Sequence, residues 1–150
     1  MNPEDVPDGP LLIDTDVVSY WVAGRGQAQR EGHAFSLLVG GHEQAVSFAT
    51  YGELLANAHM SRWGQNRIEQ LRSVITRFVI LPYSFQVVEL WARMHARLGQ
   101  QLHRGGTNDL WTAACALAID PQLPIVTNNL NDFQTIAAAF PDLRLIHPDL

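Results

Sequence analysis

The chain has 150 residues, of which 47% are hydrophobic, and its formal net charge of −5 comes from fifteen acidic residues and ten Arg, with no Lys. This length and apolar content suit a single domain with its own core, and the missing Lys excludes any mechanism that needs a lysine amine. The only cysteine, Cys115, excludes a disulfide framework, and no apolar run approaches the ~20 residues of a membrane span, so we expect a cytoplasmic protein with no membrane partner.

The chain begins with an acidic segment rich in Pro and Gly, at residues 1–10. Its composition is the opposite of a signal peptide, and we expect a flexible tail followed by one domain over residues 11–150. Three acids lie in this tail. If four further acids share one cation site, the rest of the surface is slightly basic. Net charge therefore neither supports nor excludes a polyanionic partner.

Short apolar runs alternate with helical patterns along the rest of the chain. The runs that indicate strands are residues 11–13, 45–49, 78–81, 124–127 and 143–146. Helical periodicity or capping signals indicate helices over residues 16–22, 28–39 and 65–77, from 50 onward, from 84 onward, over 108–119 and around 133. This alternation predicts an α/β fold in which helices flank a central parallel sheet of about five short strands.

The first strand runs directly into two carboxylates. Leu11, Leu12 and Ile13 are followed by Asp14 and, two residues later, by Asp16. A strand buried on both faces of a parallel sheet need not alternate in polarity, and Asp readily ends a strand and starts a helix. Because open α/β sheets bind ligands at the carboxyl ends of their strands, this acidic pair is a candidate site.

Other polar residues occupy equivalent positions after later strands. Glu53 follows the second strand, Asp109 begins an Ala-rich helix, and Thr127 ends the fourth strand just before Asn129 and Asp132. The strand ends converge on one edge, so these carboxylates would be neighbours that repel one another unless a cation joins them. Hard divalent cations such as Mg²⁺ or Mn²⁺ are held by a few carboxylates together with waters and substrate phosphate. The pattern therefore predicts a metal site for phosphoryl chemistry.

Each acid also has a purely structural interpretation. Asp16 and Asp132 would cap helices, Thr50 and Glu53 fit a capping box, and Asp109 lies where a helix dipole favours an anion. Each of these readings is reasonable for one residue alone. The argument for a site rests on the acids occurring together.

Four segments of the sequence resemble the signature blocks of PIN-domain ribonucleases, and most closely those of VapC-type toxins from bacterial toxin–antitoxin pairs. The segments are Leu12-Ile13-Asp14-Thr15-Asp16-Val17-Val18, Thr50-Tyr51-Gly52-Glu53-Leu54, Asn108-Asp109-Leu110-Trp111-Thr112-Ala113-Ala114 and Ile125-Val126-Thr127-Asn128-Asn129-Leu130-Asn131-Asp132-Phe133. Any one block is a weak signal, but four in the family's order, spanning residues 11–145 with the intervening strands, are a strong one.

The resemblance implies a PIN-like three-layer fold and divalent-metal-dependent cleavage of RNA, in which a metal-activated water attacks phosphorus. By motif position, Asp14, Glu53 and Asp109 would be the catalytic, metal-binding acids. Asp16, Thr127 and Asn129 would support them, and Asn129 stands where many members have a fourth acid, which puts a second metal in doubt. The resemblance also implies a small antitoxin partner, a homodimer and arrest of translation.

Two residues near the acids have weaker interpretations. Arg104 precedes Asp109 closely enough to contact substrate phosphate, although a turn between helices explains it equally well. Trp111 follows the acid in the same helix, and we expect it to pack in the core rather than to stack on a base.

Two other functions remain open. Asp14-Thr15-Asp16-Val17-Val18 also matches the motif of haloacid-dehalogenase-like phosphatases, in which the first Asp is a nucleophile. Those enzymes need a later Lys or Arg and an acidic pair, and this chain has neither a Lys nor an Asp-Asp pair. The second alternative is a catalytically weak PIN fold that only binds RNA or a protein, for which the amide of Asn129 is the main argument.

Overall fold

A parallel five-stranded sheet forms the centre of the computed structural model, which describes residues 1–23 and 25–150, without the side chains of Ala23 and Arg104. All four strand pairings are parallel, in the order β3-β2-β1-β4-β5. The strands are β1 (Leu11–Ile13), β2 (Gln44–Ser47), β3 (Val79–Leu81), β4 (Ile125–Val126) and β5 (Leu145–Ile146). The predicted α/β class and the parallel sheet are confirmed.

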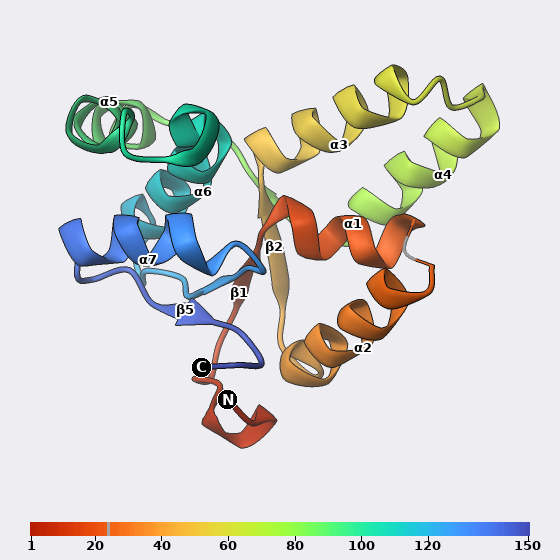
Figure 1. The fold of residues 1–150 in the computed structure, drawn as a ribbon, viewed down its shortest axis with the longest axis horizontal. Coiled ribbons are helices and arrows are strands. Elements are labelled where there is room, and N and C mark those ends of the chain that lie inside the picture. Colours follow the sequence, from red (N-terminus) through yellow and green to blue (C-terminus); the bar gives the residue numbers. More distant parts are fainter. Residues whose placement is uncertain (24) are drawn as a thin grey trace.

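Helices cover both faces of this sheet (Figure 1). One layer contains α1 (Thr15–Ala23), α2 (Gln27–Val39), α3 (Phe48–Met60) and α4 (Gln65–Ile75). The other contains α5 (Phe85–Leu98), α6 (Thr107–Ala118) and α7 (Leu130–Ala139). The 3-10 turns η1 (Pro3–Asp5) and η2 (His103–Gly106) precede β1 and α6. Sheet and helices thus make the three layers expected from the sequence.

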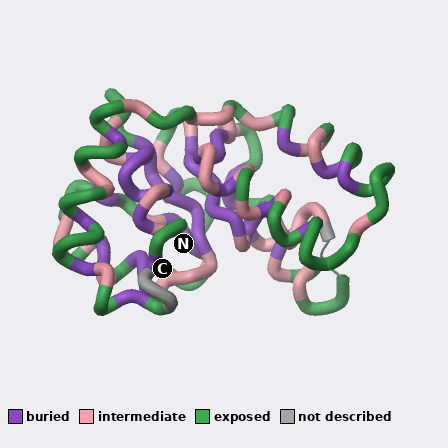
Figure 2. The backbone as a smooth tube through the Cα atoms, turned by 90° about the horizontal axis from the view of Figure 1, so that it is seen from above, coloured by how far each residue is buried: buried purple, intermediate pink, exposed green. Residues whose placement is uncertain are grey.

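The central strand β1 is buried on both faces, as its unbroken apolar run predicts. Leu11 and Ile13 pack into the cluster under α1–α4, whereas Leu12 points to the cluster under α5–α7. All three side chains are inaccessible to solvent. Figure 2 shows the buried positions gathered in the middle of the molecule and the exposed ones on its rim. Burial on this scale fixes the register of β1, and with it the position of the residue that follows.

The boundary between β2 and α3 differs from the prediction. The strand ends at Ser47 and not at Ala49, and the helix begins at Phe48. The Ser47 hydroxyl accepts a hydrogen bond from the backbone N–H of Thr50, at 3.1 Å, and so caps the helix. The capping-box interpretation of Thr50 and Glu53 is therefore wrong, because both residues lie inside the helix.

The N-terminal segment lies against the body of the chain. Val6 is buried in the cluster beneath α1–α4, and Met1 packs against that cluster. The flexibility expected for residues 1–10 and the single domain over residues 11–150 stay predictions. None of the helices that the structure describes is both long enough and apolar enough to span a bilayer.

Candidate active site

The candidate site lies at the carboxyl ends of β1 and β4, where the strand order reverses. Within the sheet, β2 and β3 lie on one side of β1, and β4 and β5 lie on its other side. Ligands bind at such switch points in open α/β sheets, because the connections on either side diverge and leave a crevice. Asp14 follows β1 and Thr127 follows β4, and the Thr127 hydroxyl donates to Asp14 Oδ2 at 2.8 Å. This bond joins the two sides of the switch point.

Asp14 is the most deeply buried acid of the site, with 4% of its surface exposed. Its Oδ1 accepts the backbone N–H of Thr15 at 2.8 Å. Burial, followed by repulsion from Asp16 and Asp109, raises the pKa of Asp14 well above the ordinary aspartate value, and the two hydrogen bonds offset only part of this. The ionised form of Asp14 is thus disfavoured unless a proton or a cation compensates its charge.

Asp16 is held by backbone groups on both sides of the switch point. It lies within the first turn of α1, so it is not the residue that caps this helix. Its carboxylate accepts the backbone N–H of Val17 at 2.7 Å and that of Asn128 at 3.1 Å. Burial raises the pKa of Asp16, and these two hydrogen bonds counteract the increase. The contact with Asn128 fits the supporting role expected for Asp16.

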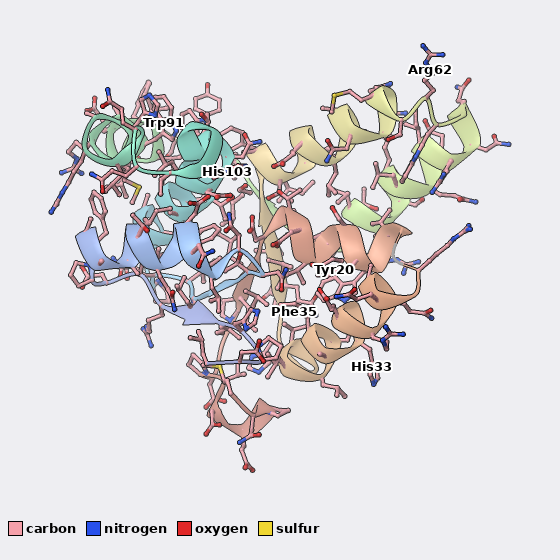
Figure 3. All side chains as sticks on the ribbon, in the orientation of Figure 1. Tyr20, His33, Phe35, Arg62, Trp91 and His103 are labelled. Atoms are coloured by element: carbon pink, nitrogen blue, oxygen red, sulfur yellow. The ribbon has the colours of Figure 1, made fainter. Side chains whose placement is uncertain are left out.

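A polar chain behind Asp16 fixes the orientation of Asn128. Asn128 Nδ2 donates to the Tyr20 hydroxyl at 2.8 Å, and its Oδ1 lies 3.3 Å from His147 Nε2. His147 Nδ1 accepts the backbone N–H of Asp149 at 2.9 Å, so the ring hydrogen is on Nε2 and points to Asn128. Figure 3 shows Tyr20 on α1, facing α2. Burial, with the acceptor Glu31 next, raises the pKa of Tyr20 to about 12, so the phenol stays protonated.

Glu53 reaches the site from the second turn of α3. Its Oε2 lies 3.1 Å from the hydroxyl of Thr15, the residue between Asp14 and Asp16. The helix that carries Glu53 starts directly after β2, so its side chain is placed by a strand end, as predicted. Contact with Thr15 rather than with its own helix start distinguishes this carboxylate from a capping residue.

Asp109 approaches the site from the first turn of α6, where the helix dipole favours an anion. The turn before this helix needs a glycine, because Gly106 adopts φ +54° and a Cβ there would collide with Leu102. Burial raises the pKa of Asp109 to about 7, with further contributions from nearby carboxylates. In order of size, these are Asp132, Asp16 and Glu53.

Asn129 joins Asp109 to α7. Its side-chain amide donates to Asp109 Oδ2 at 2.9 Å and to Asp132 Oδ2 at 3.1 Å. Asn129 itself is the N-cap residue of α7, so the proposed cap at Asp132 is wrong. Asp132 instead accepts the backbone N–H of His103 at 3.2 Å, and it ties the turn before α6 to α7. A structural role for Asp132 stays a prediction, although the expected cap is not the contact that it makes.

The site carries negative charge that no described side chain neutralises. The two ion pairs of the described residues, Arg72 with Glu69 and His147 with Asp149, both lie outside the acidic group. Within the same residues, no three acidic, His or Cys side chains form a ready-made cage for a metal ion. The donor set nevertheless suits one, because Asp14, Glu53 and Asp109 offer hard oxygen ligands whose mutual repulsion a divalent cation would relieve. The predicted contact of the Arg104 side chain with substrate falls outside the described residues.

Trp111 packs as expected, stacked on Trp91 with ring centroids 4.5 Å apart and edge-on to Phe48 at 5.4 Å. The contributions of Thr15, Asn128 and His147 were missed. No sequence signal could have found them, because each acts through a partner distant in the chain.

Comparison with protein families decides the family. The PIN domain family model matches residues 11–138, which include every acid of the site. The chain belongs to the PIN-domain family. PIN domains are nucleases, and this membership removes the haloacid-dehalogenase-like alternative.

Solved structures share the fold of this PIN domain over nearly its whole length. VapBC2 from Rickettsia felis, bound to a DNA fragment from its promoter, matches with a TM-score of 0.70 at 22% identity, covering 91% of this chain and 97% of the other. VapBC-1 from nontypeable Haemophilus influenzae matches with 0.69 at 24%, covering 94% and 99%. VapBC-5 from Mycobacterium tuberculosis, of the VapBC family of toxin–antitoxin systems, matches with 0.62 at 22%, covering 93% and 99%. No curated protein gives a significant sequence match.

Proposed function

We propose that this PIN domain is a divalent-metal-dependent endoribonuclease in which Asp14, Glu53 and Asp109 hold Mg²⁺ or Mn²⁺. The observation that carries the proposal is the arrival of these three carboxylates from three different elements at the switch point of the sheet. Two of them have raised pKa values through burial and mutual repulsion. An enzyme that holds a cation there gains back the free energy that the repulsion costs.

The residues of the site have separate roles in phosphodiester hydrolysis. Asp14 and Asp109 would hold the cation, and Glu53 would orient the attacking water and accept its proton. A bound cation would supply stabilisation of the charge that develops on the phosphoryl oxygens. Thr127 and Asp16 keep Asp14 and the β4 end in register through the hydrogen bonds described above.

The amide of Asn129 limits the site to one strongly bound cation. Its Nδ2 points to Asp109 and Asp132, so a hydrogen-bond donor occupies the place of a fourth acid. Two-metal sites need carboxylates that bridge or flank both ions. Asp14, Glu53 and Asp109, with an amide in place of a fourth acidic ligand, suit a single divalent cation.

We further propose that the enzyme is the toxin of a toxin–antitoxin pair. Support comes from the neighbours in fold, which are VapBC proteins, one of them described as part of a toxin–antitoxin system. The partners would then be an RNA whose cleavage arrests translation, a small antitoxin and a second copy of this chain. Expression in bacteria tests this: growth should stop without the adjacent small open reading frame, resume with it, and continue in Asp14→Asn. Growth unaffected by the wild-type chain would contradict the toxin role.

Cleavage of a fluorescent RNA by the purified chain tests the enzymatic proposal. We expect cleavage with Mn²⁺ or Mg²⁺, none with EDTA, and loss of cleavage in Asp14→Asn with the fold retained. Asp142→Asn, at an exposed acid that follows α7 in the chain, is the matched control and should cleave normally. Cleavage that survives both EDTA and Asp14→Asn would refute the assignment.

The alternative is a PIN fold that binds RNA or a protein without cleaving RNA. It rests on Asn129, which removes one charge from the site. Such a module would bind RNA equally well with and without Mn²⁺. If Mn²⁺ raises the melting temperature of the wild-type chain and Asp109→Ala removes that increase, the metal site is real and the binding-only alternative fails.

A further inference from the structure

Four buried hydroxyls form a continuous row that ends at Glu53. Thr15 Oγ1 lies 3.1 Å from Glu53 Oε2 and 3.0 Å from Thr50 Oγ1. Ser47 Oγ lies 3.3 Å from Thr50 Oγ1 and 3.3 Å from Thr112 Oγ1. The row crosses from α1 through α3 and the end of β2 to α6. It therefore links the Glu53 carboxylate to the helix that carries Asp109.

None of these hydroxyls has water as an alternative partner. Ser47 and Thr50 are inaccessible, Thr112 is 1% exposed and Thr15 is 7% exposed. A helical Thr often returns its hydroxyl to a carbonyl of the preceding turn, but the Thr50 hydroxyl contacts Thr15 and Ser47 instead. Buried hydroxyls that bond each other in this way depend on one another for their positions.

The hydrogen bonds of the row converge on Thr50. Thr15 Oγ1 donates to Thr50 Oγ1 and to Glu53 Oε2, and Ser47 Oγ donates to Thr50 Oγ1. Ser47 and Thr112 share a hydrogen bond in which either hydroxyl can be the donor. Thr50 therefore anchors the Thr15 hydroxyl beside the Glu53 carboxylate, and Ser47 and Thr112 support Thr50 from the other side.

We propose that this hydroxyl row positions the Glu53 carboxylate for catalysis and that Thr50, in its middle, is a positioning residue. The inference rests on the proposed ribonuclease function and adds residues that lie outside the acidic set. Thr50 touches neither metal nor substrate in this scheme. It acts through Thr15, because it accepts a hydrogen bond from the Thr15 hydroxyl and so holds that hydroxyl beside Glu53.

Thr50→Val tests the proposal, because valine keeps the shape of threonine and removes the hydroxyl. We expect kcat for RNA cleavage to fall by about tenfold, a part of the 10²–10⁴ that a positioned base contributes, while KM changes by less than about twofold. Thr50→Ser restores the hydroxyl without the methyl group and should recover kcat to within about threefold of wild type. A role in packing alone predicts the reverse order, since serine leaves a cavity and valine does not.

The controls separate this inference from the function on which it rests. Ser36→Ala removes a hydroxyl bonded to the Gly32 carbonyl, far from the acids, and should leave kcat unchanged. If the wild-type chain cleaves no RNA, the proposed function fails and the inference fails with it. If the wild-type chain cleaves and Thr50→Val has normal kcat, only the inference is overturned.

Thr112→Val provides the answer if Thr50→Val does not fold. It removes the far end of the row and leaves the Thr50 and Thr15 hydroxyls in place. We expect a smaller fall in kcat, about threefold, with KM unchanged. A kcat equal to that of the wild type would overturn the proposal.

Discussion

Asn129 donates its side-chain amide to the carboxylate of Asp109 at 2.9 Å, and the other hydrogen of the same nitrogen reaches Asp132 at 3.1 Å. A neutral group thus bridges two acids that would otherwise face each other directly. This arrangement keeps Asp109 in place before any cation binds. A change at position 129 should therefore shift the stability of the metal-free protein and the affinity for a metal ion in opposite directions.

Asn129→Asp should destabilise the metal-free protein and tighten metal binding. A third carboxylate between Asp109 and Asp132 adds repulsion and removes both hydrogen bonds, at a cost of about 1–3 kcal/mol in the free energy of unfolding. Urea denaturation with EDTA and titration calorimetry with Mn²⁺ measure the two effects. Asn131→Asp, an exposed change two residues away, should alter neither. Unchanged stability in Asn129→Asp would show that the amide does not bridge the acids.

Asp14→Asn should raise the stability of the metal-free protein while it removes catalysis. The asparagine is uncharged, so the burial and repulsion that raise the pKa of Asp14 no longer cost free energy at neutral pH. We expect a gain on the order of 1–2 kcal/mol in urea denaturation at pH 8 with EDTA. Lower stability in Asp14→Asn would mean that the hydrogen bonds from Thr15 and Thr127 outweigh the repulsion.

The stability of the metal-free protein should fall as pH rises from about 4 to about 7. Asp109 has a folded-state pKa raised to about 7, so between these values the folded state binds a proton that the unfolded state has lost. Each such proton decreases the free energy of unfolding by up to about 1.4 kcal/mol per pH unit. Denaturation midpoints across this range measure the slope.

Two controls identify the source of that slope. Asp109→Asn should reduce it and leave the part that comes from Asp14 and Asp16, whose pKa values are also raised. Saturating Mn²⁺ should abolish it, because a bound cation favours the ionised carboxylate. A slope that is the same in Asp109→Asn would place the titrating group elsewhere.

Tyr20→Phe should destabilise the protein by about 1 kcal/mol, because it leaves the partly buried amide of Asn128 without its acceptor. Tyr51→Phe is the matched control, since no hydrogen bond of the Tyr51 hydroxyl is found among the described residues. Urea denaturation of both variants measures the difference. Equal stability of the two would show that the Asn128 chain contributes nothing.

The sequence predicts most of the sheet and the acids of the site for a physical reason. Apolar runs such as Leu11–Ile13 can only be buried, and a carboxylate placed directly after such a run must lie at the edge of the sheet. Asp14 therefore follows from its neighbours alone. The predicted start of α3 at residue 50 is wrong, because Ser47 and Thr50 are both capping residues and only the length of β2 decides between them.

The supporting hydrogen bonds could not be predicted, because they depend on distances between elements. His147 and Asn128 are 19 residues apart, and Thr15 and Thr50 are 35 apart. Their pairing follows from the register of β1 with β2 and of β4 with β5, which no single segment encodes. Local patterns identify the reactive groups, and only the assembled sheet identifies what holds them.

The direct passage from β2 into α3 has a consequence for how this gene can change in length. No loop residue separates Ser47 from Phe48, and Glu53 lies on the helix that starts there. One inserted residue would turn Glu53 by about 100° around the helix axis, away from Asp14. Insertions and deletions that preserve the enzyme should therefore occur elsewhere, as in the turn at Gly40 and Gly41. Selection should remove those that occur between positions 47 and 53.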